Sequence, residues 1–222
     1  MVFPRKVLAV VFDMDGLLID TEVVWRDSMF GEARARGLEL PIATFKRMIG
    51  SPRPATRRIL LEQFGEAFPV EDYLEGAGRR FHELLDVESL LKAGVVELLD
   101  LIDHLGLPKA IATSSGHDAV RLHLGPSGLL ARFDAVIARG DYLNGKPAPD
   151  PFLAAAAALG VAPELCLALE DSHNGVRAAH AAGMMTVMVP DLLEPNAEMH
   201  AKCVHIAESL HAVERLLAGA ER

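Results

Sequence analysis

Short apolar runs recur along the chain, and each of them ends in polar or turn-forming residues. Continuous apolar runs of this length are typical of strands buried on both faces, as in a parallel sheet. Stretches with helical periodicity separate them, and this alternation predicts an α/β fold with a doubly wound, mostly parallel, Rossmann-like sheet. The expected strands cover residues 6–12, 108–112, 135–138, 165–169 and 185–189, and the expected helices cover residues 95–105, 117–124, 151–159 and 175–182.

Residues 21–90 interrupt this alternation, because they show helical periodicity without a convincing strand. The helical stretches are separated by residues that end helices, such as Gly37, Gly50 and Pro69. We therefore expect an all-helical domain at residues 21–90. It is inserted into a sheet domain that is formed by residues 1–20 and 91–222.

Polar clusters follow three of the expected strands. Ligands of doubly wound sheets bind beyond the carboxyl ends of the strands, so these clusters are expected to meet at one edge of the sheet. The clusters are Asp13 with Asp15, Thr113 with Ser114 and Ser115, and Glu170 with Asp171.

Asp13 with Asp15, and Glu170 with Asp171, form two acidic pairs at this expected edge. Two such pairs would repel each other unless a cation neutralised them. Mg²⁺ suits the site, because it prefers oxygen ligands and binds a few carboxylates together with water and substrate phosphate. Zinc is disfavoured, because structural zinc sites are built from Cys and His, whereas the two acidic pairs supply carboxylates. For Asp13 and Asp15 alone, a turn or a helix N-cap with incidental acids is the alternative.

Three further residues have the chemistry to hold a phosphate. Thr113 and Ser114 are expected where a strand turns into a helix, so their hydroxyl and backbone N–H groups can contact an anion. An ordinary N-cap cluster is the alternative for these residues. Lys146 lies in Gly145-Lys-Pro-Ala-Pro-Asp-Pro, where prolines stiffen the backbone and would fix the position of the lysine.

The overall charge limits the classes of partner. The net charge of −9 on 222 residues argues against a nucleic-acid partner, because phosphate backbones are bound by clustered Lys and Arg. The sequence shows no secretion signal and no apolar run near the roughly 18 residues of a membrane span. We therefore expect no membrane association and a cytoplasmic location. Cys166 and Cys203 lie in apolar runs and are interpreted as buried core thiols.

Four motifs along the chain resemble those of the haloacid dehalogenase superfamily, in its phosphatase and β-phosphoglucomutase-like branch. The resemblance spans essentially the whole chain, and its specificity comes from the order of the motifs. They read Asp13-Met-Asp-Gly-Leu-Leu-Ile-Asp-Thr-Glu, Thr113-Ser-Ser, Lys146-Pro-Ala-Pro-Asp-Pro and Glu170-Asp-Ser-His-Asn-Gly.

The resemblance implies a phosphatase that acts on a small phosphorylated metabolite, similar to a sugar phosphate. Asp13 would attack phosphorus and form an aspartyl-phosphate. Asp15 would protonate the leaving oxygen and then activate the water that hydrolyses the intermediate. Thr113, Ser114 and Lys146 would hold the phosphoryl oxygens. Mg²⁺ would be bound by Asp13, the backbone carbonyl of Asp15, Glu170 and Asp171.

The helical insertion matches the cap domain of this superfamily, which closes over the site and excludes bulk water. Arg53 lies where related mutases carry an arginine that binds a second phosphate, and a surface arginine at a helix start is the alternative. Trp25 resembles a residue of sugar-phosphate phosphatases, and core packing is the alternative. Because other cap residues of the mutase pattern are absent, we expect a phosphatase, with a β-phosphoglucomutase-like phosphomutase as the alternative.

A phospho-acceptor signalling receiver is an alternative from a different class. Receivers also combine acidic residues, an acceptor aspartate, a hydroxyl residue and a lysine. Their fold is shorter, lacks a helical insertion, and places its acidic pair before the hydroxyl and lysine positions.

For the oligomeric state of the chain we expect a monomer or a weak homodimer.

Overall fold

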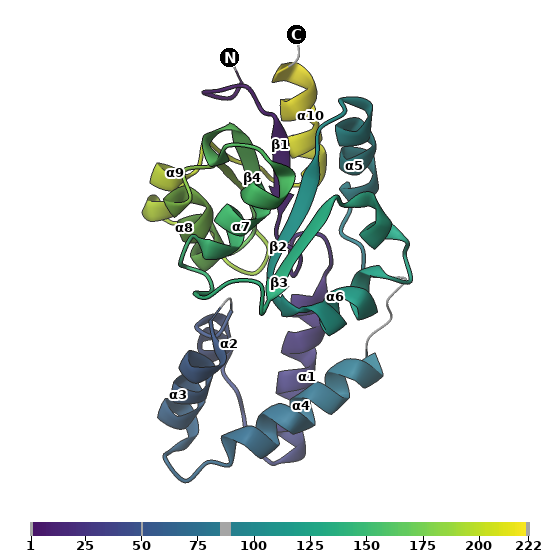
Figure 1. Cartoon of the computed structure of the whole chain (residues 1–222). Helices are drawn as coiled ribbons and strands as arrows, with labels where there is room; N and C mark the ends of the chain where they lie inside the picture. Colours follow the sequence, from purple (N-terminus) through teal and green to yellow (C-terminus); the bar gives the residue numbers. More distant parts are fainter. Residues whose placement is uncertain (1, 50, 85–89, 221–222) are drawn as a thin grey trace. The chain divides into compact units, whose positions relative to one another are not determined.

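The chain divides into two compact units, Met1–Ile19 with Val87–Arg222 and Asp20–Asp86. The computed structural model describes residues 2–49, 51–84 and 90–220 (Figure 1). The functional division into a catalytic core and a cap at residues 21–90 remains a prediction, and its positions 50 and 85–89 lie outside the described residues.

A six-stranded sheet forms the centre of the first unit, with the order β3-β2-β1-β4-β5-β6. All five neighbouring pairs are parallel. This order defines a doubly wound sheet, which confirms the predicted fold class. The strands are β1 Ala9–Phe12, β2 Lys109–Gly116, β3 Ala135–Arg139, β4 Cys166–Glu170, β5 Met185–Met188 and β6 His205–Ile206.

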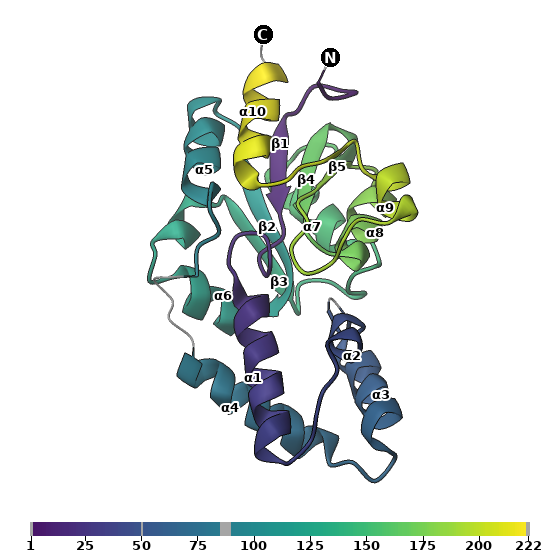
Figure 2. The ribbon, with the colours of Figure 1, turned by 180° about the vertical axis from the view of Figure 1, so that it is seen from behind.

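Helices cover both faces of this sheet. The opposed views show α7 and α8 on one face and α5 and α10 on the other (Figures 1 and 2). The helices of this unit are α5 Val95–His104, α6 His117–Leu124, α7 Asp150–Leu159, α8 His173–Ala181, α9 Ala197–Lys202 and α10 Leu210–Ala220, with short 3₁₀ helices η2 Leu129–Arg132 and η3 Pro163–Leu165.

Small side chains on one face of the sheet set the position of α7. Ala9 and Val11 of β1 point to the same face, because side chains alternate along a strand. They belong to one buried cluster with Phe152 and Ala155 of α7 and with Cys166 of β4. Complete burial of a ring such as Phe152 contributes roughly 1.5–3 kcal/mol. The alanine-rich α7 thus packs closely against the face of the strands that carry the polar clusters.

The second unit is helical throughout its regular elements, which are α1 Thr21–Ala35, α2 Ile42–Lys46, α3 Arg53–Phe64 and α4 Val70–Leu84. Helices α1 and α4 are joined by a buried carboxylate, because Glu32 binds Arg36 and Arg80, each at 2.8 Å. The hydroxyl of Tyr73 also donates to the carbonyl of Met29 at 2.7 Å. These contacts link α1 to α4 within the unit.

The structure differs from the sequence-based expectation at the end of β2. The strand was expected to end at residue 112, but it continues through Thr113 to Gly116. Its pairing with β3 shifts register after Ala112 and resumes between Gly116 and Arg139. Thr113 and Ser114 therefore lie within a strand, and α6 begins only at His117.

The two cysteines are free thiols. Cys166 is fully buried, as expected, and Cys203 is half-buried. Burial raises the pKa of both thiols to about 11. In the described part of the chain, no helix is both long and apolar enough to span a membrane.

Candidate active site at the carboxyl ends of β1 and β4

Asp13 and Glu170 are brought together by the register of two neighbouring strands. Phe12 pairs with Leu169, and the Asp13 N–H donates to the carbonyl of Leu169 at 3.0 Å. Strands β1 and β4 flank the point where the strand order reverses along the sequence. In doubly wound sheets this switch point is where ligands bind. The two acidic motifs therefore meet there, as the sequence predicted.

Lys146 lies between these two carboxylates. Its ammonium contacts Asp13 Oδ1 directly and lies 2.6 Å from Glu170 Oε1. Only 4% of its side chain is exposed, and Nζ is 4.9 Å from the centre of the Phe152 ring. Lys146 follows β3 in the loop that leads into α7, where its peptide bond with Pro147 is cis. The lysine is therefore part of the site and not a surface side chain.

Burial and neighbouring charges both shift the pKa values of Asp13 and Lys146. Burial raises the pKa of Asp13 to about 8, the charges of Glu170 and Asp15 add to the rise, and Lys146 opposes it. Burial alone would lower the pKa of Lys146, but Asp13 and Glu170 outweigh it and raise that pKa above its ordinary value. The lysine is therefore protonated, and the carboxylates outnumber it.

Glu170 is held by donors on both of its oxygens. Oε1 accepts from Lys146, and Oε2 accepts from the N–H of Asp171 at 3.1 Å and from both the N–H and the hydroxyl of Ser172 at 3.0 Å. Ser172 also caps α8, because its hydroxyl accepts from the N–H of Gly175 at 3.1 Å. A Cβ at Gly175 would lie 1.7 Å from Glu170 Oε1. Glycine at this position therefore leaves the space that the glutamate occupies.

The donor set fits a hard divalent cation. Carboxylate oxygens of Asp13, Glu170 and Asp171 all lie within 4.8 Å of one another, and all three residues are buried. Asp171 reaches the loop after β1, where a Cβ at Gly16 would lie 2.4 Å from Asp171 Oδ2. Gly16 also has φ of +89°, which L side chains rarely adopt. Three buried carboxylates with one ammonium leave excess negative charge, which Mg²⁺ would neutralise through oxygen ligands.

Hydroxyl groups of β2 approach Asp15 from the neighbouring strand. Thr113 is fully buried, and its Oγ1 donates to Asp15 Oδ2 at 3.4 Å. The hydroxyl of Ser115 donates to the same oxygen at 2.7 Å. Ser114, between them, is exposed. The carbonyl of Thr113 accepts from the Tyr142 hydroxyl at 3.0 Å.

The structure thus brings most of the predicted site residues together at one edge of the sheet. The sequence interpretation assigned no role to Ser115, Tyr142 or Ser172, which contact predicted residues through hydrogen bonds. The residues that meet at this edge are Asp13, Asp15, Thr113, Ser114, Lys146, Glu170 and Asp171.

Arg53 and Trp25 belong to the helical unit and are described within it. Arg53 Nη2 lies 2.5 Å from Glu71 Oε2, and 64% of its side chain is exposed. Trp25 is half-buried and meets the ring of Phe81 edge-on, with centroids 5.8 Å apart. Both residues therefore have partners inside this unit, and their contact with substrate remains a prediction.

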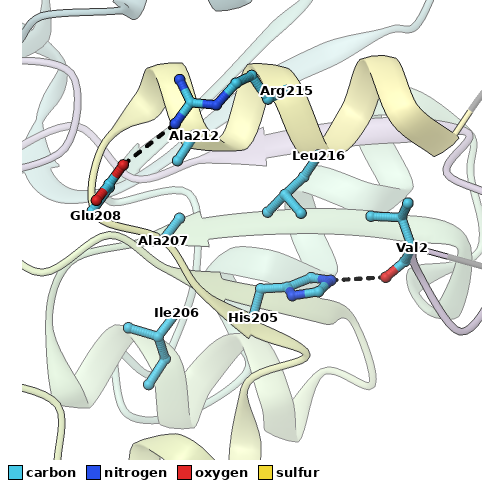
Figure 3. Close-up of a pocket in the computed structure, with 8 residues that line it drawn as sticks. All are labelled: Val2, His205, Ile206, Ala207, Glu208, Ala212, Arg215 and Leu216. Atoms are coloured by element: carbon cyan, nitrogen blue, oxygen red, sulfur yellow. Dashed lines mark hydrogen bonds and ion pairs between the residues drawn. The ribbon is translucent and has the colours of Figure 1, made fainter.

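A cavity of about 450 Å³ lies elsewhere on the sheet unit (Figure 3). It is lined by the N-terminal segment, β6 and α10, and its polar contacts are internal. His205 contacts the carbonyl of Val2 at 2.8 Å, and Arg215 pairs with Glu208 at 3.3 Å (Figure 3). None of the predicted site residues lines it.

Comparison with known proteins identifies the family of the chain and a class of enzyme that is consistent with the acidic site. The model of the haloacid dehalogenase-like hydrolases matches residues 7–183, and the chain belongs to this family. A Drosophila melanogaster protein named as a probable pseudouridine-5'-phosphatase is 37% identical over 84% of this chain and 83% of its own length. A Thermotoga maritima phosphorylated carbohydrates phosphatase is 33% identical over 79% of this chain and 82% of its own length. The enzyme class that these relatives support is a phosphatase.

The crystal structure of a Clostridium difficile β-phosphoglucomutase has the same fold, with a TM-score of 0.74. The two chains are 23% identical, and the alignment covers 96% of this chain and 98% of the other. At this identity the likeness speaks for the fold alone. Phosphatases and mutases therefore share the architecture described here, and the fold does not separate them.

The signalling-receiver alternative is wrong, because the family match extends over most of the chain.

Proposed function

We propose that this chain is a Mg²⁺-dependent phosphatase that hydrolyses a small phosphorylated metabolite of the sugar-phosphate type through an aspartyl-phosphate on Asp13. The observation that carries the proposal is the buried contact of Asp13 with Lys146 beside Glu170 and Asp171. Asp and Glu act as covalent nucleophiles in phosphoryl transfer, where catalysis depends mainly on positioning and charge neutralisation.

In the first step, an oxygen of Asp13 attacks phosphorus and the bond from phosphorus to the leaving oxygen breaks. Asp15 donates a proton to that oxygen, which leaves as an alcohol. In the second step Asp15 takes a proton from water, the water oxygen attacks phosphorus, and the Asp13 carboxylate is regenerated with release of phosphate. Lys146 and Thr113 are proposed to hold the phosphoryl oxygens, together with the backbone N–H of Ser114, whose side chain is exposed.

Asp13, Asp171 and the backbone carbonyl of Asp15 are the proposed direct ligands of Mg²⁺, which supplies charge neutralisation for the phosphoryl group when bound. Glu170 is proposed to act indirectly. Both of its oxygens already accept hydrogen bonds from Lys146, Asp171 and Ser172, so displacing these donors would be costly. Its main role is then to orient Lys146 and the turn that carries Asp171.

The substrate class is supported by the relatives, whose names specify pseudouridine-5'-phosphate and phosphorylated carbohydrates. The test is a panel of p-nitrophenyl phosphate, sugar phosphates, pseudouridine-5'-phosphate, phosphoglycolate and nucleotides, with phosphate release measured with Mg²⁺ and with EDTA. The proposal predicts Mg²⁺-dependent release, with the highest kcat/KM for a sugar-type monophosphate. Absence of release from every substrate, or full activity in EDTA, would overturn it.

A sugar phosphomutase remains the second candidate, because Arg53 stands at the cap position expected for a second phosphate. A mutase must hold two phosphates and protect its aspartyl-phosphate from water, whereas a phosphatase must promote that hydrolysis. Incubation of a hexose monophosphate with a catalytic amount of its bisphosphate separates them. Isomerisation without phosphate release would replace the phosphatase assignment with the mutase.

A further inference from the structure

Ser115 forms a side-chain hydrogen bond to Asp15 that is shorter than the one from Thr113 of the same strand. Its hydroxyl donates to Asp15 Oδ2 at 2.7 Å, whereas Thr113 Oγ1 lies at 3.4 Å from the same oxygen. The N–H of Ser115 in turn donates to Thr113 Oγ1 at 3.0 Å. Ser115 and Thr113 thus form one hydrogen-bonded group around a single carboxylate oxygen.

The unusual course of β2 explains why Ser115 reaches Asp15. Residues i and i+2 of a strand point to the same face, so Thr113 and Ser115 both face the loop after β1 while Ser114 points away and is exposed. The register with β3 shifts between Ala112 and Gly116. The hydroxyl of Tyr142 anchors this shifted segment through the carbonyl of Thr113.

We propose that Ser115 is a positioning residue for Asp15 and determines how well the enzyme expels leaving groups that require a proton. The inference rests on the proposed role of Asp15 as acid and base. A carboxyl group that donates a proton must lie within about 2.6–3.2 Å of the acceptor in the correct orientation. The hydrogen bond from Ser115 to Oδ2 fixes the rotation of this carboxyl group, and loss of the bond lets it turn away.

The leaving group reveals this role. An alkyl oxygen of a sugar phosphate needs a proton as its bond to phosphorus breaks, whereas p-nitrophenolate leaves as a stable anion. General acid catalysis typically raises the rate about 10²–10⁴-fold. Partial loss of the alignment of the Asp15 carboxyl group should therefore lower kcat/KM about tenfold or more with an alkyl phosphate. With p-nitrophenyl phosphate the same substitution should have little effect on kcat/KM, which reports the step that forms the aspartyl-phosphate.

The experiment measures kcat/KM for a sugar phosphate and for p-nitrophenyl phosphate in wild type, Ser115→Ala, Ser115→Cys and Ser115→Thr. The Ala and Cys variants should lower the ratio of the two values about tenfold, and Thr, which keeps the hydroxyl, should restore it. Ser115→Cys retains the size of the side chain and provides the result if Ser115→Ala does not fold. Ser114→Ala is the comparison on the same strand, because its exposed side chain points away from Asp15 and its removal should leave the ratio of the two values unchanged.

An unchanged ratio in Ser115→Ala or Ser115→Cys would overturn the positioning role. The proposed function has its own control in Asp15→Asn, which should lower the same ratio more strongly than either Ser115 variant. If Asp15→Asn leaves the ratio unchanged, the acid assigned in the proposed function is wrong. If Asp15→Asn lowers the ratio and the Ser115 variants do not, only the role of Ser115 fails.

Discussion

Lys146 Nζ lies 2.6 Å from Glu170 Oε1 while it also contacts Asp13, so a single buried ammonium joins the loop after β3 to the ends of β1 and β4. Glu170 is fully buried, and Asp13 is only 7% exposed. The Lys146 ammonium therefore serves two purposes that can be separated experimentally. It compensates buried carboxylate charge, which affects the stability of the fold. It also places a cation beside the proposed nucleophile, which affects turnover.

Removal of the ammonium should destabilise the fold. Lys146→Met leaves the buried carboxylate of Glu170, and that of Asp13 wherever it is ionised, without a compensating charge, and loss of one partner of a buried ion pair typically costs about 3–5 kcal/mol. Urea unfolding without Mg²⁺ measures the free energy of unfolding. Lys202→Met is the matched control, because Lys202 pairs with Glu198 at the surface at 4.0 Å and such pairs contribute about 0–1 kcal/mol. Equal effects of the two substitutions would show that Lys146 carries no such role.

A methyl group at Gly175 should disturb the site through Glu170. Its Cβ would overlap Glu170 Oε1, so Gly175→Ala should lower the free energy of unfolding by about 1–3 kcal/mol, as overpacking does. Mg²⁺-dependent turnover should fall with it. Gly78→Ala in α4 is the matched control, because nothing lies within 4 Å of its Cβ and alanine favours a helix interior by about 1 kcal/mol. A Gly175→Ala protein with wild-type stability and activity would contradict the described position of Glu170.

The stabilisation by Mg²⁺ should increase with pH. In the metal-free protein burial raises the pKa of Asp13 to about 8, so its contribution to stability is present at low pH and is lost as pH rises through that value. Mg²⁺ binds the ionised carboxylate, so its stabilising effect should be small at pH 6 and larger at pH 8.5–9. At 100 times the dissociation constant the gain is about 2.7 kcal/mol.

Thermal unfolding with Mg²⁺ and with EDTA across this pH range checks the sign of the dependence. Asp13→Asn, which cannot titrate at this position, should lose most of it. A Mg²⁺ effect that is constant with pH, or that shrinks as pH rises, would contradict the proposed competition between protons and the cation.

Arg53 should be dispensable for phosphate release from a monophosphate. Its guanidinium is exposed and pairs with Glu71 at the surface of the helical unit. Arg53→Ala should therefore change kcat/KM by no more than about threefold, or roughly 0.6 kcal/mol. The variant is assayed with the best sugar monophosphate of the panel. A loss of 100-fold or more would place Arg53 in substrate binding and would favour the phosphomutase.

Much of the site could be predicted from the sequence because it depends on short local patterns. Apolar runs that end in Asp13 and Glu170 predict buried parallel strands, and parallel strands bring their carboxyl ends to one edge. Lys146 was identified through the prolines around it. Its burial between two carboxylates required the structure, because sequence spacing does not state which strands are neighbours.

The missed features depend on longer-range geometry. β2 was expected to end at residue 112, because Thr113 to Gly116 are polar residues typical of a turn. The strand continues because the Tyr142 hydroxyl holds the carbonyl of Thr113 and pairing with β3 resumes at Gly116. Had that continuation been known, alternation would have placed Ser115 on the same face as Thr113. Ser172 had a local signal, since a serine before a helix commonly caps it.

The short strand β6 and helix α10 were not predicted either. β6 comprises only His205 and Ile206 at the edge of the sheet, too short for any alternation to be visible. The contacts of Arg53 with Glu71 and of Trp25 with Phe81 could not be predicted from the sequence, because they depend on how the helices of this unit pack.

Covalent phosphorylation of Asp13 tests the central claim most directly. Wild-type protein is mixed with an excess of a good substrate and Mg²⁺, quenched in acid within milliseconds, digested, and analysed by mass spectrometry for a phosphorylated peptide. The account predicts an acid-stable, hydroxylamine-sensitive phosphate on Asp13. The Asp13→Asn protein should show neither this phosphate nor turnover. Full turnover by Asp13→Asn, or phosphate trapped on a different side chain, would contradict it.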